Sequence, residues 1–148
     1  MTKRKVVLDT NVLASGLIGF RNPASPVAHI LRLWRAGGFT LVTSEHILTE
    51  LSHTLHTPYF RRRLTPQQIT SAISLFRSET TSAPITAKVQ GVATHPEDDV
   101  ILVTAVSTKA NYLVTGDTKL QQLGAYQGVT ILSPRRFLEA LEHDVSEK

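Results

Sequence analysis

The chain has 148 residues, of which 41% are hydrophobic and 19% are charged, and its mean hydropathy is −0.04. These proportions exclude an intrinsically disordered chain and an integral membrane protein, and the length suits one domain with a buried core. We expect a single domain over residues 1–141 and a polar tail over residues 142–148. Because no sustained apolar segment follows the basic residues at the start, we expect no signal peptide and a cytoplasmic location.

The sequence contains no cysteine, which excludes disulfides, thiolate metal sites and cysteine nucleophiles. Any metal ion would therefore be held by carboxylates, histidines or water. Lysine and arginine number 16 against 12 aspartates and glutamates, and the isoelectric point is about 9.7. This basic bias suits a polyanionic partner without requiring one.

Apolar runs alternate with stretches of helical periodicity along the chain. Buried strands are predicted at residues 5–9, 39–44, 112–117 and 129–132, and a short strand at 85–89 within a loop over 80–91. Helices are predicted to begin near residues 25, 44, 65, 96, 120 and 133, in most cases at a capping side chain or a proline. This alternation predicts a three-layer α/β/α domain with a central parallel sheet of four to five strands.

Two of the predicted strands end on an aspartate. "VVLD" ends on Asp9, and "YLVTGD" ends on Asp117. In an open parallel sheet, ligands bind beyond the carboxyl ends of the strands, which is where both side chains would lie. Two neighbouring carboxylates repel each other and lose hydration, and a hard divalent cation compensates for both effects. Either aspartate alone would be explained as well by a helix cap, but the pair favours a cation site.

Further acids are candidates to join this pair. Asp99 lies in the first turn of the helix predicted from residue 96, directly after Glu97 and Asp98, and acids at that position also complement the helix dipole. Glu50 lies beside the apolar face of the helix predicted from residue 44, where a glutamate is more often a surface residue than a ligand. The residues alone leave both interpretations open at each position.

Four segments bear on these interpretations together: "VVLDTNVL", "LTEL", "HPEDDVILVTAV" and "YLVTGD". In this order they resemble the PIN-domain ribonucleases, in particular the small bacterial members known as toxin components of toxin–antitoxin pairs. The resemblance extends from about Lys5 to about Leu141. It implies a PIN-like fold and hydrolysis of RNA phosphodiester bonds to products with 5′-phosphate and 3′-hydroxyl ends.

The resemblance also assigns catalytic and metal-binding roles. It implies that four acids gather in one pocket and hold one or two Mg²⁺ or Mn²⁺ ions: Asp9, Glu50, Asp99 and Asp117. It implies that Asn11 orients the first aspartate, that Thr115 orients the last, and that Asp98 is the alternative to Asp99. Many relatives carry another acid just after the last aspartate, where this chain has Thr118 and Lys119. This departure concerns the second metal position rather than the activity.

RNA, a cognate antitoxin protein and a second copy of the chain are the partners that the resemblance implies. Four basic residues are candidates for contacts with RNA backbone phosphates: Arg61, Arg62, Arg63 and Lys119. The three arginines follow Tyr59 and Phe60, whose rings would either stack on bases or pack into the core.

Two other functions fit parts of the sequence. A haloacid-dehalogenase-like phosphatase would use Asp9 as its nucleophile, but it needs a second aspartate two positions later, where this chain has Asn11. A non-catalytic RNA-binding or protein-binding domain on the same fold would be indicated by an incomplete set of acids. Here all four acids are present, so we expect a metal-dependent endoribonuclease.

Overall fold

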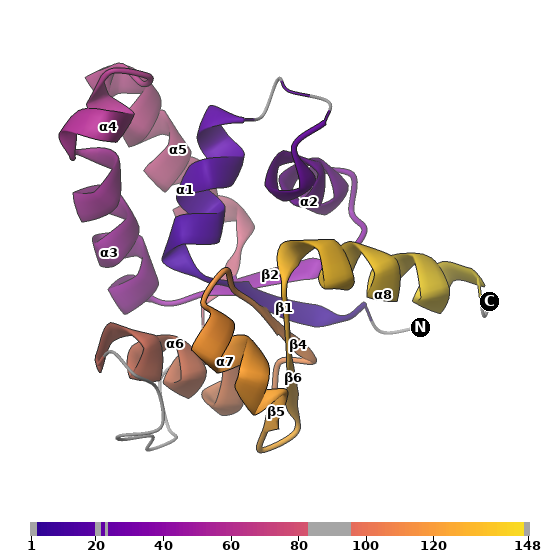
Figure 1. Ribbon diagram of the computed structural model, residues 1–148. Coiled ribbons are helices and arrows are strands. Elements are labelled where there is room, and N and C mark those ends of the chain that lie inside the picture. The colour runs from indigo at the N-terminus through magenta and orange to yellow at the C-terminus, as the bar shows by residue number, and fades with distance from the viewer. Residues whose placement is uncertain (1–2, 20–21, 23, 83–95, 147–148) are drawn as a thin grey trace.

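The computed structural model describes residues 3–19, 22, 24–82 and 96–146, and at residues 82, 96–99 and 144–146 it describes the backbone alone. Within these residues the strands form one sheet with the order β3-β2-β1-β4-β6-β5 (Figure 1). Their bounds are β1 (Lys5–Leu8), β2 (Thr40–Thr43), β3 (Thr81–Ser82), β4 (Tyr112–Val114), β5 (Ala125–Tyr126) and β6 (Val129–Leu132). All neighbours pair in parallel except β5, which runs antiparallel to β6 at the edge.

Helices lie on both sides of this sheet. Their bounds are α1 (Thr10–Ile18), α2 (Pro26–Arg35), α3 (Glu45–Leu55), α4 (Pro58–Arg61), α5 (Pro66–Glu79), α6 (Pro96–Ser107), α7 (Thr118–Leu123) and α8 (Pro134–Ser146). Figure 1 shows α1, α2 and α8 on one side and α6 and α7 on the other, with α3, α4 and α5 stacked beside α1. The predicted three-layer α/β/α architecture is confirmed, and its parallel part has five strands.

The central strand β1 is buried because its apolar run is continuous rather than alternating. Val6, Val7 and Leu8 are at most 1% exposed, as expected for a parallel strand that is covered on both faces. The register pairs Leu8 with Val114 at the end of β4. The residues that follow the two strands therefore lie side by side at the carboxyl ends of β1 and β4.

Predicted helix starts are confirmed at three side-chain caps. The hydroxyl of Ser25 accepts a hydrogen bond from the backbone N–H of Ala28, and Ser44 does the same for Ile47, each at 3.2 Å. Thr65 forms a capping box, in which its hydroxyl and the Gln68 side chain each bond the other residue's backbone N–H. These bonds satisfy N–H groups that a helix terminus leaves unpaired.

Helix α1 was not predicted from the sequence. It begins directly after Asp9 and buries Val12, Leu13 and Ala14, so its residues lack the polar face that marks a surface helix. It packs tightly on α2 at Gly16, where an added Cβ atom would lie 2.6 Å from the Cδ1 atom of Leu31. This contact fixes the helix that carries one wall of the site described below.

Other elements differ from the predictions at their boundaries. The helix α4 occupies residues that were predicted to connect two helices, and α8 continues to Ser146. Residues 142–146 of the predicted polar tail are helical and extend α8. Strands β3 and β5 have two residues each and were not predicted, because so short a segment shows no periodicity. The strand predicted at 85–89 lies outside the described residues.

The described helices are all too short or too polar to cross a bilayer.

Candidate active site

A cavity of about 610 Å³ opens at the carboxyl ends of β1 and β4. Strand order reverses between these two neighbours. The strands that follow β1 in the chain, β2 and β3, lie on one side of it, and the strands that follow β4, β5 and β6, lie on the other side of the sheet. Open parallel sheets bind their ligands at such a point. The described residues that line the cavity are Asp9, Thr10, Asn11, His46, Ile47, Glu50, Thr54, Val100, Ile101, Gly116 and Asp117.

Asp9 lies at the base of this cavity and is only 6% exposed. Its Oδ2 atom accepts a hydrogen bond of 2.7 Å from the hydroxyl of Thr115. Burial raises the pKa of Asp9 above its ordinary value, and the charge of Asp117 adds to this rise. The Thr115 hydrogen bond and the backbone N–H groups of Asn11 and Thr10 act in the opposite direction and lower the pKa. The cavity thus holds a carboxylate whose charge is poorly compensated by its surroundings.

Asp117 is half-buried and has a second structural role. Its Oδ1 atom accepts hydrogen bonds from the backbone N–H groups of Lys119 at 2.8 Å and Leu120 at 3.0 Å, so it caps α7. The helix-cap interpretation considered for the strand-end aspartates is therefore correct for Asp117. Both bonds use Oδ1, which leaves the Oδ2 atom outside the cap. A cap and a cation ligand are compatible in one carboxylate that has two oxygens.

Thr115 connects the two aspartates and is fully buried. Its hydroxyl donates to the carboxylate of Asp9 and accepts from the backbone N–H of Asp117 at 3.0 Å. The resemblance predicts that this threonine orients Asp117, but the carboxylate that its hydroxyl contacts is that of Asp9. Gln121 holds the same segment, because its Nε2 atom donates to the carbonyl oxygen of Thr115 at 2.7 Å. Gln121 is not predicted from the sequence, where only its position one turn into a capped helix would indicate it.

Glu50 reaches the cavity from a different layer of the fold. It lies on α3 and is exposed, with His46 one turn before it and Thr54 one turn after it in the cavity wall. The start of α3 is tied to α6 by a buried hydrogen bond of 3.1 Å between the hydroxyls of Ser44 and Thr104. Asp9, Glu50 and Asp117 thus line one cavity although they are far apart in the sequence.

Asp98 and Asp99 occupy the first turn of α6. Their side chains are outside the described part of the structure, so the choice between them stays a prediction. Val100 and Ile101 follow directly and line the cavity, which places the start of α6 in its wall. Asn11 lies in the opposite wall, at the start of α1, and is exposed.

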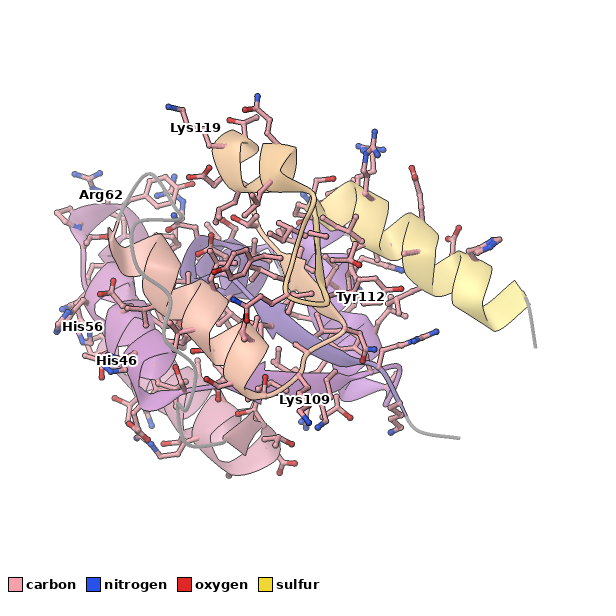
Figure 2. All side chains as sticks on the ribbon, turned by 90° about the horizontal axis from the view of Figure 1, so that it is seen from below. His46, His56, Arg62, Lys109, Tyr112 and Lys119 are labelled. Carbon is pink, nitrogen blue, oxygen red and sulfur yellow. The ribbon has the colours of Figure 1, made fainter. Side chains whose placement is uncertain are left out.

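The predicted RNA-binding residues lie outside the described cavity lining. Arg61, Arg62 and Arg63 are exposed at α4 and its end, and the guanidinium of Arg63 stacks over the ring of Tyr59 at 3.8 Å. Arg63 also donates a 2.8 Å hydrogen bond to the Tyr59 carbonyl oxygen, so its guanidinium is held in place by a residue of α4. Lys119 is exposed on α7 (Figure 2).

The donor set fits a hard cation better than a softer one. Among the residues whose side chains are described, no three acids or histidines form a cluster close enough for a metal site. Mg²⁺ usually keeps several waters and is bound through one or two carboxylates, so the pair Asp9 and Asp117 meets its needs. Oxygen donors and the absence of cysteine from the chain exclude a thiolate site for zinc or copper.

A family model described as PIN domain matches residues 5–119. The chain belongs to the PIN-domain family. The matched range includes the four segments that supply Asp9, Glu50, Asp99 and Asp117, so the resemblance noted in the sequence is confirmed at the level of the family. The match favours a nuclease over the haloacid-dehalogenase-like phosphatase.

Two solved structures have a fold similar to that of this chain. The structure of VapBC2 from Rickettsia felis, bound to a DNA fragment from its promoter, superposes with a TM-score of 0.57 and 18% identity over 86% of this chain and 96% of that chain. Mycobacterium tuberculosis VapC20, described as a toxin that cleaves the sarcin-ricin loop, gives a TM-score of 0.55 and 15% identity over 82% and 97%. At such identities the similarity concerns the fold. Comparison with curated proteins gave no significant match.

Proposed function

We propose that this PIN-domain protein is a metal-dependent endoribonuclease that hydrolyses RNA phosphodiester bonds with Mg²⁺ or Mn²⁺. The observation that carries the proposal is the pair of carboxylates from adjacent parallel strands, Asp9 and Asp117, in one cavity of a PIN-family chain. The buried carboxylate of Asp9 has a raised pKa, and a divalent cation would offset the cost of keeping it ionised.

The acids and the polar residues around them have different roles in this proposed chemistry. Asp9 and Asp117 would hold the metal directly, and Glu50 and Asp99 would complete the ligand set or orient the attacking water. A bound divalent cation supplies an activated water and neutralises charge that develops on the phosphate. Thr115 fixes the Asp9 carboxylate in one orientation, and Gln121 fixes Thr115. The fold therefore holds the ligands in place before the metal or the substrate arrives.

Cleavage of a mixed panel of labelled RNAs tests this proposal. We expect cleavage with Mg²⁺ or Mn²⁺, its loss in EDTA, and its loss in Asp9→Asn, which keeps the side-chain shape and the oxygen that Thr115 contacts. Glu139→Gln is the matched control, because it removes one exposed carboxylate on α8, outside the cavity lining. Labelling of the product ends tests for the 5′-phosphate.

Three results would contradict the nuclease proposal. Cleavage that persists in EDTA would exclude the metal, and full activity in Asp9→Asn would exclude the site. Hydrolysis of phosphomonoesters without RNA cleavage would support the phosphatase instead. RNA binding without any cleavage, across the whole panel, would support a non-catalytic PIN-like domain.

We propose further that the protein is the toxin of a type II toxin–antitoxin pair. Two solved structures of similar fold come from VapBC2 and from VapC20, which supports an antitoxin protein as partner. Induced expression of the wild type is expected to arrest growth, expression of Asp9→Asn is not, and co-expression of the product of the adjacent gene is expected to restore growth. Growth arrest by both forms would separate the toxicity from the carboxylate site. Light scattering of the purified chain tests the predicted homodimer.

A further inference from the structure

The cavity that contains the acids is also lined by one histidine, His46. Among its described lining residues, Asp9, Glu50 and Asp117 can each carry a negative charge, and His46 is the one whose side chain can carry a positive charge. An RNA strand brings further negative charge into this acidic site. A group that donates a hydrogen bond to a phosphate would therefore have a larger effect here than on an ordinary surface.

His46 is placed for such a contact by its helix. It lies four residues before Glu50 on α3, and residues with this spacing lie one above the other on the same helix face. Its imidazole is exposed, which suits a contact with substrate at the opening of the cavity rather than with the buried Asp9.

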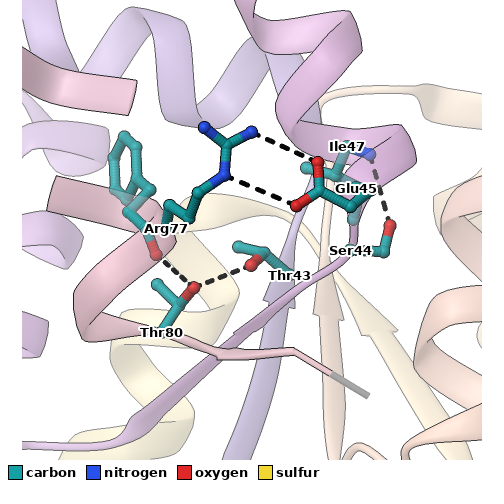
Figure 3. Close-up of polar contacts among 7 residues, drawn as sticks. Thr43, Ser44, Glu45, Ile47, Arg77 and Thr80 are labelled. Atoms are coloured by element: carbon teal, nitrogen blue, oxygen red, sulfur yellow. Dashed lines mark hydrogen bonds and ion pairs between the residues drawn. The ribbon is translucent and has the colours of Figure 1, made fainter. Parts of the chain in front are cut away.

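The residues on either side of His46 fix the start of α3 and pair the neighbouring acid, Glu45, with another helix. Ser44 caps α3 and is hydrogen-bonded to Thr104 on α6, so the first turn of α3 has a fixed place beside the cavity. Glu45 is paired with Arg77 on α5, with 3.2 Å between the Oε2 and Nη2 atoms (Figure 3). Glu45 is thereby directed toward α5, and His46, the next residue, toward the cavity.

We propose that His46 is a substrate-binding residue of the nuclease, which donates a hydrogen bond to a backbone phosphate next to the scissile one. This inference rests on the proposed function and adds a specificity to it: the site selects a polynucleotide, in which a second phosphate accompanies the bond to be cleaved. Because the contact lies at the opening of the cavity and not at the reacting atoms, His46 affects binding of the RNA and not the chemical step.

Binding can be measured apart from cleavage. In an Asp9→Asn background, fluorescence anisotropy with a fluorescein-labelled single-stranded RNA gives the dissociation constant without turnover. We expect His46→Ala to weaken binding about tenfold, which is typical for the loss of one hydrogen bond to a charged group, and His46→Gln to restore part of it through its N–H donor. The matched control is His53→Ala, which removes an exposed imidazole from the same helix outside the cavity lining. It should bind RNA like the parent.

With Asp9 intact, His46→Ala should raise KM about tenfold and leave kcat unchanged. Equal RNA affinity with and without His46, in otherwise folded proteins, would overturn the inference. A fall in kcat with unchanged affinity would also overturn it, since His46 would then act in the chemical step. If the wild type cleaves RNA while His46→Ala does so equally well, the proposed function stands and this inference fails. If the wild type does not cleave RNA and the Asp9→Asn parent does not bind it, both fail together.

Discussion

The hydroxyl of Thr115 donates a 2.7 Å hydrogen bond to the carboxylate of Asp9, although 106 residues separate the two in the sequence. The bond joins the ends of β4 and β1, whose parallel pairing brings the two residues side by side. The bond stabilises the ionised form of a buried acid. The acid–base behaviour of the site therefore depends on a residue that is not itself a metal ligand.

Replacing Thr115 by valine is expected to shift the pH dependence of RNA cleavage. Burial raises the pKa of Asp9, and the Thr115 hydrogen bond lowers it, so losing that bond raises the pKa further. Because the proposed mechanism requires the ionised carboxylate, the acid limb of kcat/KM should move to higher pH in the valine variant. Thr115→Ser keeps the hydroxyl and should resemble the wild type. A valine variant with an unchanged acid limb would show that the hydrogen bond does not tune Asp9.

Replacing Asp9 by asparagine is expected to stabilise the metal-free protein at neutral pH. A raised pKa means that the folded state binds the proton more tightly than the unfolded state, whose pKa is near 3.8. This contribution to stability is present below that value and is lost as the pH rises through the raised pKa of the folded state. The neutral asparagine avoids the loss, so the variant should have a higher free energy of unfolding at pH 7, a difference that disappears in acid. Thermal unfolding monitored by circular dichroism at several pH values checks both parts.

Added metal should reverse this order of stability. Millimolar Mg²⁺ or Mn²⁺ is expected to raise the Tm of the wild type, because an ion that binds only the folded state stabilises it, by about 2.7 kcal/mol at a hundred times its Kd. Asp9→Asn should respond much less, and Ca²⁺-free buffer with EDTA gives the baseline. Equal increases in both proteins would place the metal elsewhere.

Two helix caps offer a matched pair of substitutions. Ser44→Ala and Thr65→Ala each remove a hydroxyl that caps a helix start, and each should lower the free energy of unfolding by about 1 kcal/mol. Only Ser44 is also bonded to Thr104 next to the cavity, so only Ser44→Ala should reduce RNA cleavage at a temperature where both variants are folded. Similar activity of the two variants would show that the tie between α3 and α6 does not position the site.

The basic cluster at α4 is expected to contribute to RNA affinity through charge alone. A triple alanine variant at residues 61–63 should weaken binding and flatten its salt dependence, by about 0.7 in the logarithmic slope for each lost contact with single-stranded RNA. Arg63 is held by Tyr59, so Arg63→Ala alone should have less effect than Arg62→Ala. The exposed pair Arg135 and Arg136 on α8 provides the control. An equal loss of RNA affinity for each removed charge at α4 and at α8 would indicate general electrostatic attraction instead of a binding surface at α4.

The sequence by itself determined the elements whose signals are local. A continuous apolar run predicts β1, and a hydroxyl before a helix predicts the starts at Ser25, Ser44 and Thr65, since each signal lies within a few residues. The strand-end position of Asp9 and Asp117 and the family of the chain were also accessible, because motifs are read along the sequence. The helix α1 was not, because burial removes the polar face that identifies a helix.

Only the tertiary structure decided how these residues meet. Parallel pairing of β1 with β4 gives Asp9 its partner Thr115, and packing of α3 beside the sheet brings Glu50 and His46 to the same cavity. Burial then sets the pKa of Asp9, which no local sequence pattern encodes, because desolvation depends on everything packed around the group. The sequence therefore specified the chemical groups of this site, and the fold specified their neighbours and their burial.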